Sequence, residues 1–246
     1  MLHKAKERKP IMKTRIRKLL VCASLVGAAT LAQAQFEYTN NGDGTCTITN
    51  YTGSGGAVII PDTINSLKVT GIGIGAFSRN SVITSVIVPD SVMFIRGSAF
   101  LFCPNLTSVT IGNGVTFIIK GAFGYCTSLT SAYFQGNAPN DTEEFIGDTN
   151  IVYYLPGTTN WGSTFGGRPT ELWNPQAQAP SVTGGQFGFN ITGPSNTVIV
   201  VEACTDLANS VWLPVSTNAL NDSGASMFSD SQSGSYPARF YRFRSP

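Results

Sequence analysis

Histidine is nearly absent from this 246-residue chain, and charged residues are scarce. The single histidine is His3, and charged residues make up 12% of the sequence, about half the ~25% usual in soluble proteins. After His3 there is no imidazole to serve as a general base, as part of a Ser-His-Asp or Cys-His nucleophile, or as a zinc ligand. We predict that the protein is not an enzyme and has no catalytic residues, metal or cofactor.

Basic residues are few outside the N-terminal segment. Eight of the sixteen Lys and Arg residues precede Gln35, where the only acid is Glu7, so the chain from Gln35 onward has a net charge of −5. A chain of this charge lacks the basic surface on which nucleic-acid binding depends. Together with abundant Gly, Ser, Thr and Asn, the low charge favours a β-rich, turn-rich extracellular protein.

No apolar run is long enough to cross a membrane. Residues 19–31 form an uncharged run of 13 residues, whereas an ordinary membrane span needs ~20. Four basic residues precede this run between Lys13 and Lys18, and Ala32-Gln33-Ala34 follows it, which completes the three parts of a secretory signal peptide. We predict a signal peptide at 1–34 with cleavage after Ala34. The protein would then be secreted or held at the cell surface, with no membrane span left.

A regular repeat is the strongest pattern in the chain. Ala-Phe pairs recur at 76–77, 99–100 and 122–123, which defines a 23-residue period. The apolar positions that keep the same step are Ile83, Leu106 and Leu129, then Val86, Val109 and Ala132, then Val88, Ile111 and Phe134, and finally Val92 and Val115. One unit cannot bury its own apolar face, but stacked units bury it against one another. We therefore predict a β-rich solenoid with a ladder of stacked phenylalanines, and an insertion at 67–71 in its first turn.

Four cysteines remain after the predicted cleavage: Cys46, Cys103, Cys126 and Cys204. Cys103 and Cys126 occupy equivalent inward positions one repeat apart. Two alternatives follow for this pair. The thiols can be free and packed as small hydrophobic groups, or they can form a disulfide, which an exported chain permits.

The repeat unit reads L-x-x-V-x-[IV]-x-x-x-V-x-x-I-x-x-x-A-F-x-x-C. It resembles the bacterial surface-antigen, or BspA-like, type of leucine-rich repeat over roughly residues 57–134. Gly112 stands where that family has proline, and Ala132 weakens the third strand. The resemblance implies an exported or surface protein that takes part in adhesion or in binding host or matrix components.

The rest of the chain divides around the repeats. We predict a cap hairpin at 35–56, repeats at 57–135, a C-terminal cap at 136–174, a linker at 175–181 and a small antiparallel β-sandwich at 182–246. The last segment resembles β-modules at the C-termini of other exported bacterial repeat proteins. The four acids between Asp141 and Asp148 are expected in a solvated loop.

The outward strand positions of the repeats form a flat, uncharged face. Its residues are Ser85, Ile87, Ser108, Thr110, Ser131 and Tyr133. We predict that this face binds an extracellular protein or polysaccharide, with Tyr133 as the main contact. One alternative is a carbohydrate-binding protein that stacks sugars on exposed Trp161, Trp173 or Trp212. A structural surface spacer is another.

Overall fold

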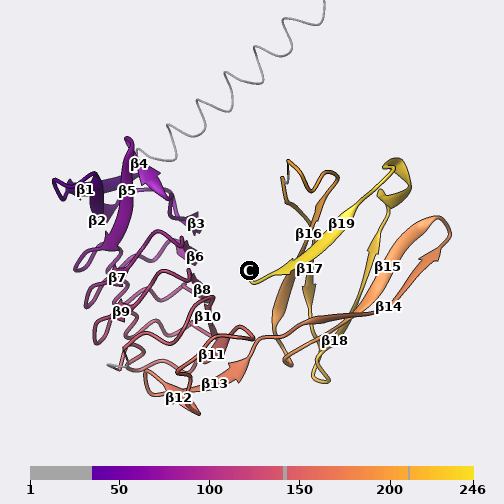
Figure 1. Cartoon of the computed structure of the whole chain (residues 1–246). Coiled ribbons are helices and arrows are strands. Elements are labelled where there is room, and N and C mark those ends of the chain that lie inside the picture. The colour runs from indigo at the N-terminus through magenta and orange to yellow at the C-terminus, as the bar shows by residue number, and fades with distance from the viewer. Residues whose placement is uncertain (1–34, 141–142, 210) are drawn as a thin grey trace, which may run out of the picture.

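The computed structural model describes residues 35–140, 143–209 and 211–246 (Figure 1). The predicted signal peptide at 1–34 lies outside these ranges. Within them, no helix is long and apolar enough to cross a membrane. The described chain is built from strands and turns, with a short 3-10 helix, η1 (Ser233–Ser235).

One sheet runs the length of the solenoid. Its parallel strands are β3 (Gly56–Ile59), β6 (Ile83–Val88), β8 (Ser108–Ile111), β10 (Ser131–Phe134), β11 (Ile151–Tyr154) and β13 (Arg168–Leu172), and β12 (Thr164–Phe165) pairs antiparallel with β13. Strands β6, β8 and β10 pair in the register of the sequence period, so that Val86, Val109 and Ala132 are neighbours. The predicted β-rich solenoid is confirmed.

A second sheet forms another side of the coil. It contains β1 (Phe36–Asn40), β2 (Thr45–Tyr51), β5 (Leu67–Ile72), β7 (Phe94–Ile95) and β9 (Phe117–Ile118). Strands β1 and β2 form the antiparallel hairpin expected at the N-terminal end. The insertion expected at 67–71 is β5, which makes a small hairpin with β4 (Thr63–Ile64) before it joins the parallel stack.

The solenoid core is a stack of aromatic rings. The centroids of Phe77 and Phe100 lie 4.6 Å apart and those of Phe100 and Phe123 lie 4.9 Å apart, in both cases with nearly parallel rings. Tyr51 extends the stack at one end, at 5.2 Å, and Phe145 at the other, at 5.4 Å. All the apolar positions of the repeat are buried as well. The predicted phenylalanine ladder is present, and it is longer than the repeats seen in the sequence.

The cysteines of the described chain are free thiols. Cys103 donates a hydrogen bond to the carbonyl of Phe77 at 3.1 Å, and Cys126 makes the equivalent bond to Phe100 at 3.0 Å. Interaction with Cys103 and burial hold the pKa of the Cys126 thiol well above its usual range. These two cysteines therefore act as buried packing groups that also bond to the preceding coil.

The solenoid continues beyond the boundary predicted at residue 135. The expected cap at 136–174 contributes β11 and β13 to the parallel sheet, so it forms further coils. Ala132 pairs with Val152, and Val152 pairs with Thr170, so paired positions are closer in sequence here than in the preceding coils. The spacing in sequence between paired residues shortens here, so the 23-residue period ends although the coils continue to stack.

The C-terminal module is a small β-sandwich, as predicted. One sheet contains β14 (Gln176–Thr183), β15 (Gln186–Thr192) and β18 (Ala225–Asp230); the other contains β17 (Leu213–Ala219), β16 (Val198–Cys204) and β19 (Phe240–Arg244). The linker prediction at 175–181 was wrong, because most of that stretch lies in β14. Its Pro180 falls where the pairing with β15 shifts register, and an edge strand accommodates proline at such a bulge.

Candidate binding cleft between the solenoid and the C-terminal module

The outward face of the long sheet carries the residues predicted to bind a ligand. One ladder on this face consists of Ile59, Ile87, Thr110, Tyr133 and Tyr153, paired strand by strand. Exposure falls along it from 69% at Ile59 to 2% at Thr110, 4% at Tyr133 and 3% at Tyr153. The face is therefore open at its N-terminal end and covered at its C-terminal end.

The C-terminal module is what covers it. Thr110 Oγ1 lies 3.0 Å from Ser245 Oγ and donates to the carbonyl of Pro246 at 3.2 Å. In Figure 1 the C-terminus lies between the solenoid and the module. The expectation of an exposed receptor face thus needs correction for Ser108, Thr110 and Tyr133, which are buried. Ser85, Ile87 and Ser131 stay partly exposed.

An aromatic seam, made of Tyr133, Tyr153 and Trp173, joins the two parts. The tyrosine rings stack at 5.1 Å, and the indole of Trp173 meets Tyr133 edge-on at 6.1 Å. The three side chains belong to one buried cluster with residues of the module core, among them Phe189 and Val201. Burial raises the pKa of both tyrosine hydroxyls. The seam makes the module core continuous with the solenoid surface.

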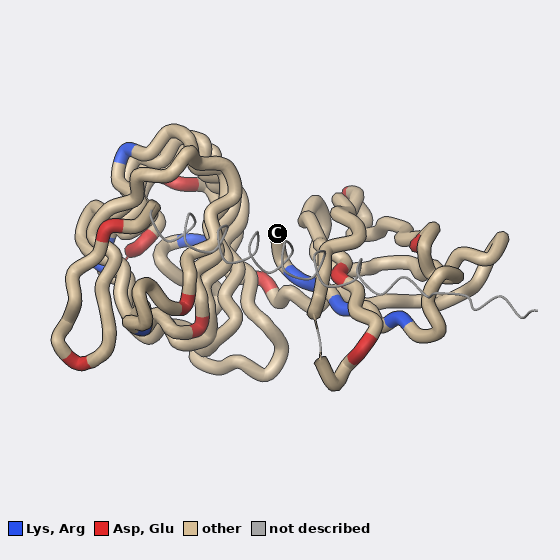
Figure 2. Tube along the Cα trace, turned by 90° about the horizontal axis from the view of Figure 1, so that it is seen from above, with Lys and Arg blue, Asp and Glu red and all other residues tan. Residues whose placement is uncertain are grey.

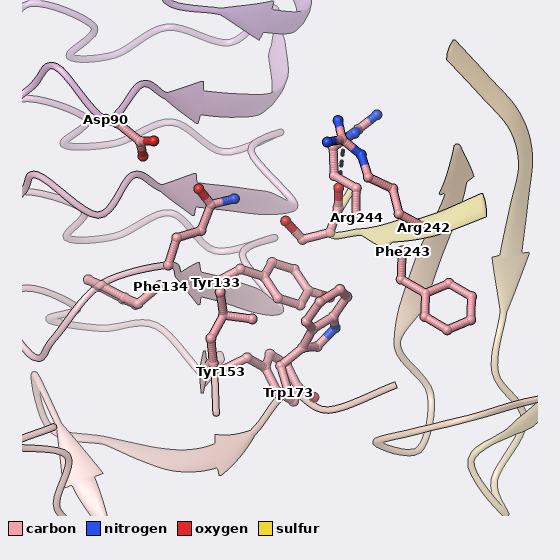
Figure 3. A pocket seen from close by; sticks show the side chains of 11 residues that line it. Asp90, Tyr133, Phe134, Tyr153, Trp173, Arg242, Phe243 and Arg244 are labelled. Carbon is pink, nitrogen blue, oxygen red and sulfur yellow. Dashed lines mark hydrogen bonds between the residues drawn. The ribbon is translucent and has the colours of Figure 1, made fainter. Parts of the chain in front are cut away.

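Above the seam lies a cleft of about 460 Å³, which Figure 3 shows from close by. The solenoid contributes Asp90 and Gln135, the seam contributes its three aromatic side chains, and β19 contributes Arg242 and Arg244. Both guanidinium groups lie at one end of the cleft, away from Trp173 and Tyr153 (Figure 3). The cleft thus has an aromatic end and a cationic end.

The two arginines are held by one buried carboxylate. Glu202 of β16 is 6% exposed. Its Oε2 accepts from Arg242 Nε at 2.8 Å, and its Oε1 accepts from Arg244 Nε at 2.9 Å. Strand alternation explains the placement, because Tyr241 and Phe243 pack against the cluster that includes the module core while the arginines alternate with them along β19. A buried acid shared by two guanidiniums fixes the position of both.

The three tryptophans lie in three different places. Trp161 stacks on Tyr154 at 5.3 Å in the last coils and donates from Nε1 to Thr158. Trp173 is buried in the seam, where its Nε1 has no hydrogen-bond partner among the described residues. The Arg242 guanidinium lies over the ring of Trp212, 4.5 Å from its centroid. Trp173 lines the cleft, and Trp212 contacts one of the cleft arginines.

Sequence reasoning missed Glu202, Arg242 and Arg244 as site residues. The signal was present, because Tyr241-Arg242-Phe243-Arg244 alternates apolar and basic residues. That alternation indicates one buried and one solvated strand face, but it says nothing of what lies opposite the solvated face. Only the docking of the module brings the arginines opposite the solenoid.

Of the acids expected in a solvated loop, Glu143 is exposed, but Glu144 and Asp148 are buried. Glu144 is fully buried and Asp148 is 3% exposed, next to Asn150, which is also fully buried. Burial raises the pKa of Asp148 to about 7, although the Cys126 amide and the charge of Arg168 act in the opposite direction. The Arg168 guanidinium donates to the backbone carbonyl of Asp148. These groups belong to the end of the solenoid core and do not line the cleft.

Comparison with known proteins matches residues 56–154 to the family described as BspA type leucine rich repeat region, in six copies. Among solved structures, a leucine-rich repeat protein of T. pallidum is 23% identical, with 49% of this chain and 69% of that chain covered and a TM-score of 0.40. A leucine-rich repeat protein of Bacteroides capillosus is 27% identical, with 48% and 94% covered and a TM-score of 0.41. No curated protein matched the chain. Residues 56–154 of the solenoid are therefore similar to leucine-rich repeat regions of the BspA type, as the sequence resemblance implied.

Proposed function

We propose that this protein is a non-catalytic binding protein, exported to the cell surface or the medium, that holds an extracellular polysaccharide or protein segment in the cleft. The signal peptide predicted from residues 1–34 supports export. The observation that carries the proposal is the cleft itself, which brings Asp90 and Gln135 of the solenoid opposite Arg242 and Arg244 of the module.

The dimensions of the cleft limit what it can hold. A volume of about 460 Å³ falls in the range of ~300–1,000 Å³ that is usual for small-ligand pockets. A stable interface between two folded proteins buries ~800 Å² on each partner and is normally much flatter. The covered strand face cannot supply such a surface. A few sugar units or a short extended segment fit the site better than a globular partner.

The chemistry of the lining favours binding over catalysis. Glycoside hydrolysis commonly uses two carboxyl groups on either side of the scissile bond. Asp90 is the one carboxylate among the described residues that line the cleft, and its Oδ1 accepts the backbone N–H of Asn113 at 2.9 Å. The remaining polar groups of the lining are suited to hold a ligand by hydrogen bonds.

The test is to bind the purified chain, from Gln35 onward, to an array of extracellular polysaccharides and matrix proteins. Ile87→Glu places a bulky charge on the open part of the strand face, where Ile87 pairs with Thr110, the residue that contacts Ser245 of the cleft. Ile74→Glu is the matched control, because Ile74 is 77% exposed and follows β5 of the other sheet.

We expect a saturable hit that Ile87→Glu weakens by at least tenfold and Ile74→Glu leaves unchanged. An equal effect of both variants would place the binding site elsewhere on the molecule. The absence of any hit, together with self-association of the purified protein, would contradict the proposal and favour a structural spacer.

A further inference from the structure

We propose that the cleft is selective for an acidic glycan, whose charged groups are bound by Arg242 and Arg244. This inference rests on the binding function proposed for the cleft and adds the chemical class of the ligand. It is carried by the free hydrogen-bonding capacity of the two guanidiniums, by the distribution of charge in the chain and by the other donors in the cleft.

Each arginine keeps donors for a ligand. A guanidinium has five N–H groups. Arg242 uses Nε and Nη2 for Glu202, while Arg244 uses Nε for Glu202 and Nη1 for the carbonyl of Ser245. Three N–H groups of each side chain are left without a partner among the described residues. Their planar arrangement matches the paired oxygens of a carboxylate or a sulfate.

The position of the arginines is fixed before a ligand arrives. Glu202 holds both Nε atoms, and the ring of Trp212 supports the guanidinium of Arg242 from one side. Ordering a long side chain on binding costs about 0.5–1.5 kcal/mol. Most of that cost does not arise when a ligand binds, because contacts inside the module already define the geometry of both side chains.

The basic residues of the module are concentrated in one place. The module from residue 175 onward contains three basic residues, Arg239 just before β19 and Arg242 and Arg244 within it, and Figure 2 shows the basic residues of the module in one run near the C-terminus. Arg239 is paired with Asp230 at 2.9 Å, so the other two form the cationic site. After subtraction of Glu202 the arginine pair carries one positive charge, and Asp90 on the solenoid side balances it over the cleft as a whole, in a chain of net charge −5 from Gln35 onward. Such a chain repels polyanions in general, so binding of one would depend on this site.

The rest of the cleft suits a ligand rich in hydroxyl groups. The seam lines the cleft with the rings of Tyr133, Tyr153 and Trp173, although the indole Nε1–H of Trp173 is itself buried out of a ligand's reach. Gln135 adds an amide to the lining, while the hydroxyl of Ser245 is already paired with Thr110. A sugar acid offers hydroxyl oxygens to the amide of Gln135 and an anionic group to the arginines. An acidic peptide carries fewer acceptors per unit length, and it is an outcome that the test distinguishes.

The experiment measures binding of the purified protein to polygalacturonate, by affinity electrophoresis and calorimetry. Fully methyl-esterified polygalacturonate has the same backbone without the charge, and dextran sulfate and poly-glutamate supply a sulfated glycan and an acidic peptide. The variants are Arg242→Gln and Arg244→Gln, with Lys68→Gln as the control, since Lys68 is an exposed basic residue of the solenoid that does not line the cleft.

We expect polygalacturonate to bind and its methyl ester to bind at least tenfold more weakly. Each arginine variant should lose at least tenfold in affinity, and Lys68→Gln less than twofold. Thermal melting verifies that the variants are folded, and Arg244→Lys provides a second test, because it keeps the charge but loses the planar donor pair and should bind less well than the native protein. Binding of dextran sulfate with the same dependence on the arginines would support the acidic-glycan class with sulfate as the anionic group.

Three results would overturn the inference. Equal binding of the esterified polymer would show that the cleft takes neutral glycans and would leave the proposed binding function intact. Binding of poly-glutamate in preference to every acidic glycan would assign the site to a protein partner. If no acidic glycan binds in an arginine-dependent way, the assignment is wrong, and the effect of Ile87→Glu on array hits then decides separately whether the cleft binds anything.

Discussion

The solenoid and the C-terminal module build their apolar cores in opposite ways. In the solenoid each inward position meets its own equivalent in the next coil, as in the parallel stack of Phe77, Phe100 and Phe123. In the module, residues at non-equivalent positions of two sheets meet, and several do so at steep angles, as Phe189 does with Tyr241 and Phe243. A repeated core can be extended coil by coil, whereas the module core is closed. The aromatic seam is the place where the two kinds of core join.

The largest effect is expected from a break in the ladder. Phe100→Ala removes a fully buried ring with a stacked neighbour on each side, and such truncations cost about 3–5 kcal/mol of unfolding free energy. Phe102→Ala is the matched control. Its ring also stacks, on Tyr125 at 4.9 Å, but it is 45% exposed, so we expect a loss of about 1 kcal/mol or less. Chemical denaturation of both variants measures the difference. Equal losses would mean that the ladder is not the principal source of solenoid stability.

The same contrast explains how much of the fold is visible in the sequence. The ladder positions, the N-terminal hairpin and the insertion at β5 follow from periodicity and turn residues, and all were predicted. The coils that carry Val152 and Thr170 were not predicted. Paired positions lie closer together in sequence there, so the 23-residue pattern ends although the strands still pair. Strand β14 was missed because Pro180 at a bulge looks like the end of a linker in sequence.

The candidate site was predictable only in part. Sequence alternation identified the outward ladder that contains Ile87, Thr110 and Tyr133, but it could not indicate which part of the ladder another domain covers. Docking depends on residues far apart in the chain, such as Thr110 and Ser245, and no local pattern relates them. The arginines opposite were seen as surface residues for the same reason.

The second prediction concerns the seam. Trp173→Ala removes the indole that lies between the solenoid tyrosines and the module, and we expect a loss of about 3 kcal/mol. Because the seam couples the two cores, calorimetry should show one unfolding transition for the native protein and two for the variant. Trp212→Ala, outside the seam, should lower stability without separating the transitions. Two transitions in the native protein would show that the seam does not couple the regions.

The smallest effect, counted per pH unit, concerns buried acids, which the two regions treat differently. In the module, Asp230 is paired with Arg239 and accepts from the Tyr241 hydroxyl at 2.9 Å. At the end of the solenoid, Asp148 is buried, and the nearby guanidinium of Arg168 binds a backbone carbonyl instead of the carboxylate. Burial raises the pKa of Asp148 to about 7 from a usual value of 3.8. The solenoid should therefore respond to pH between about 4 and 7 through the carboxyl group of Asp148.

Proton linkage gives the direction in which stability changes with pH. Between about pH 4 and pH 7 the folded chain keeps a proton on Asp148 that the unfolded chain releases, so the stability present below pH 4 is lost as the pH rises to 7. The steepest slope for one proton is about 1.4 kcal/mol per pH unit, and solvent access reduces it. Asp148→Asn, which stays neutral, should flatten the dependence in denaturation experiments between pH 4 and 8. Asp230→Asn, which unpairs Arg239, should lower stability without flattening that slope. A slope that survives in Asp148→Asn would mean that another group of the solenoid binds the proton.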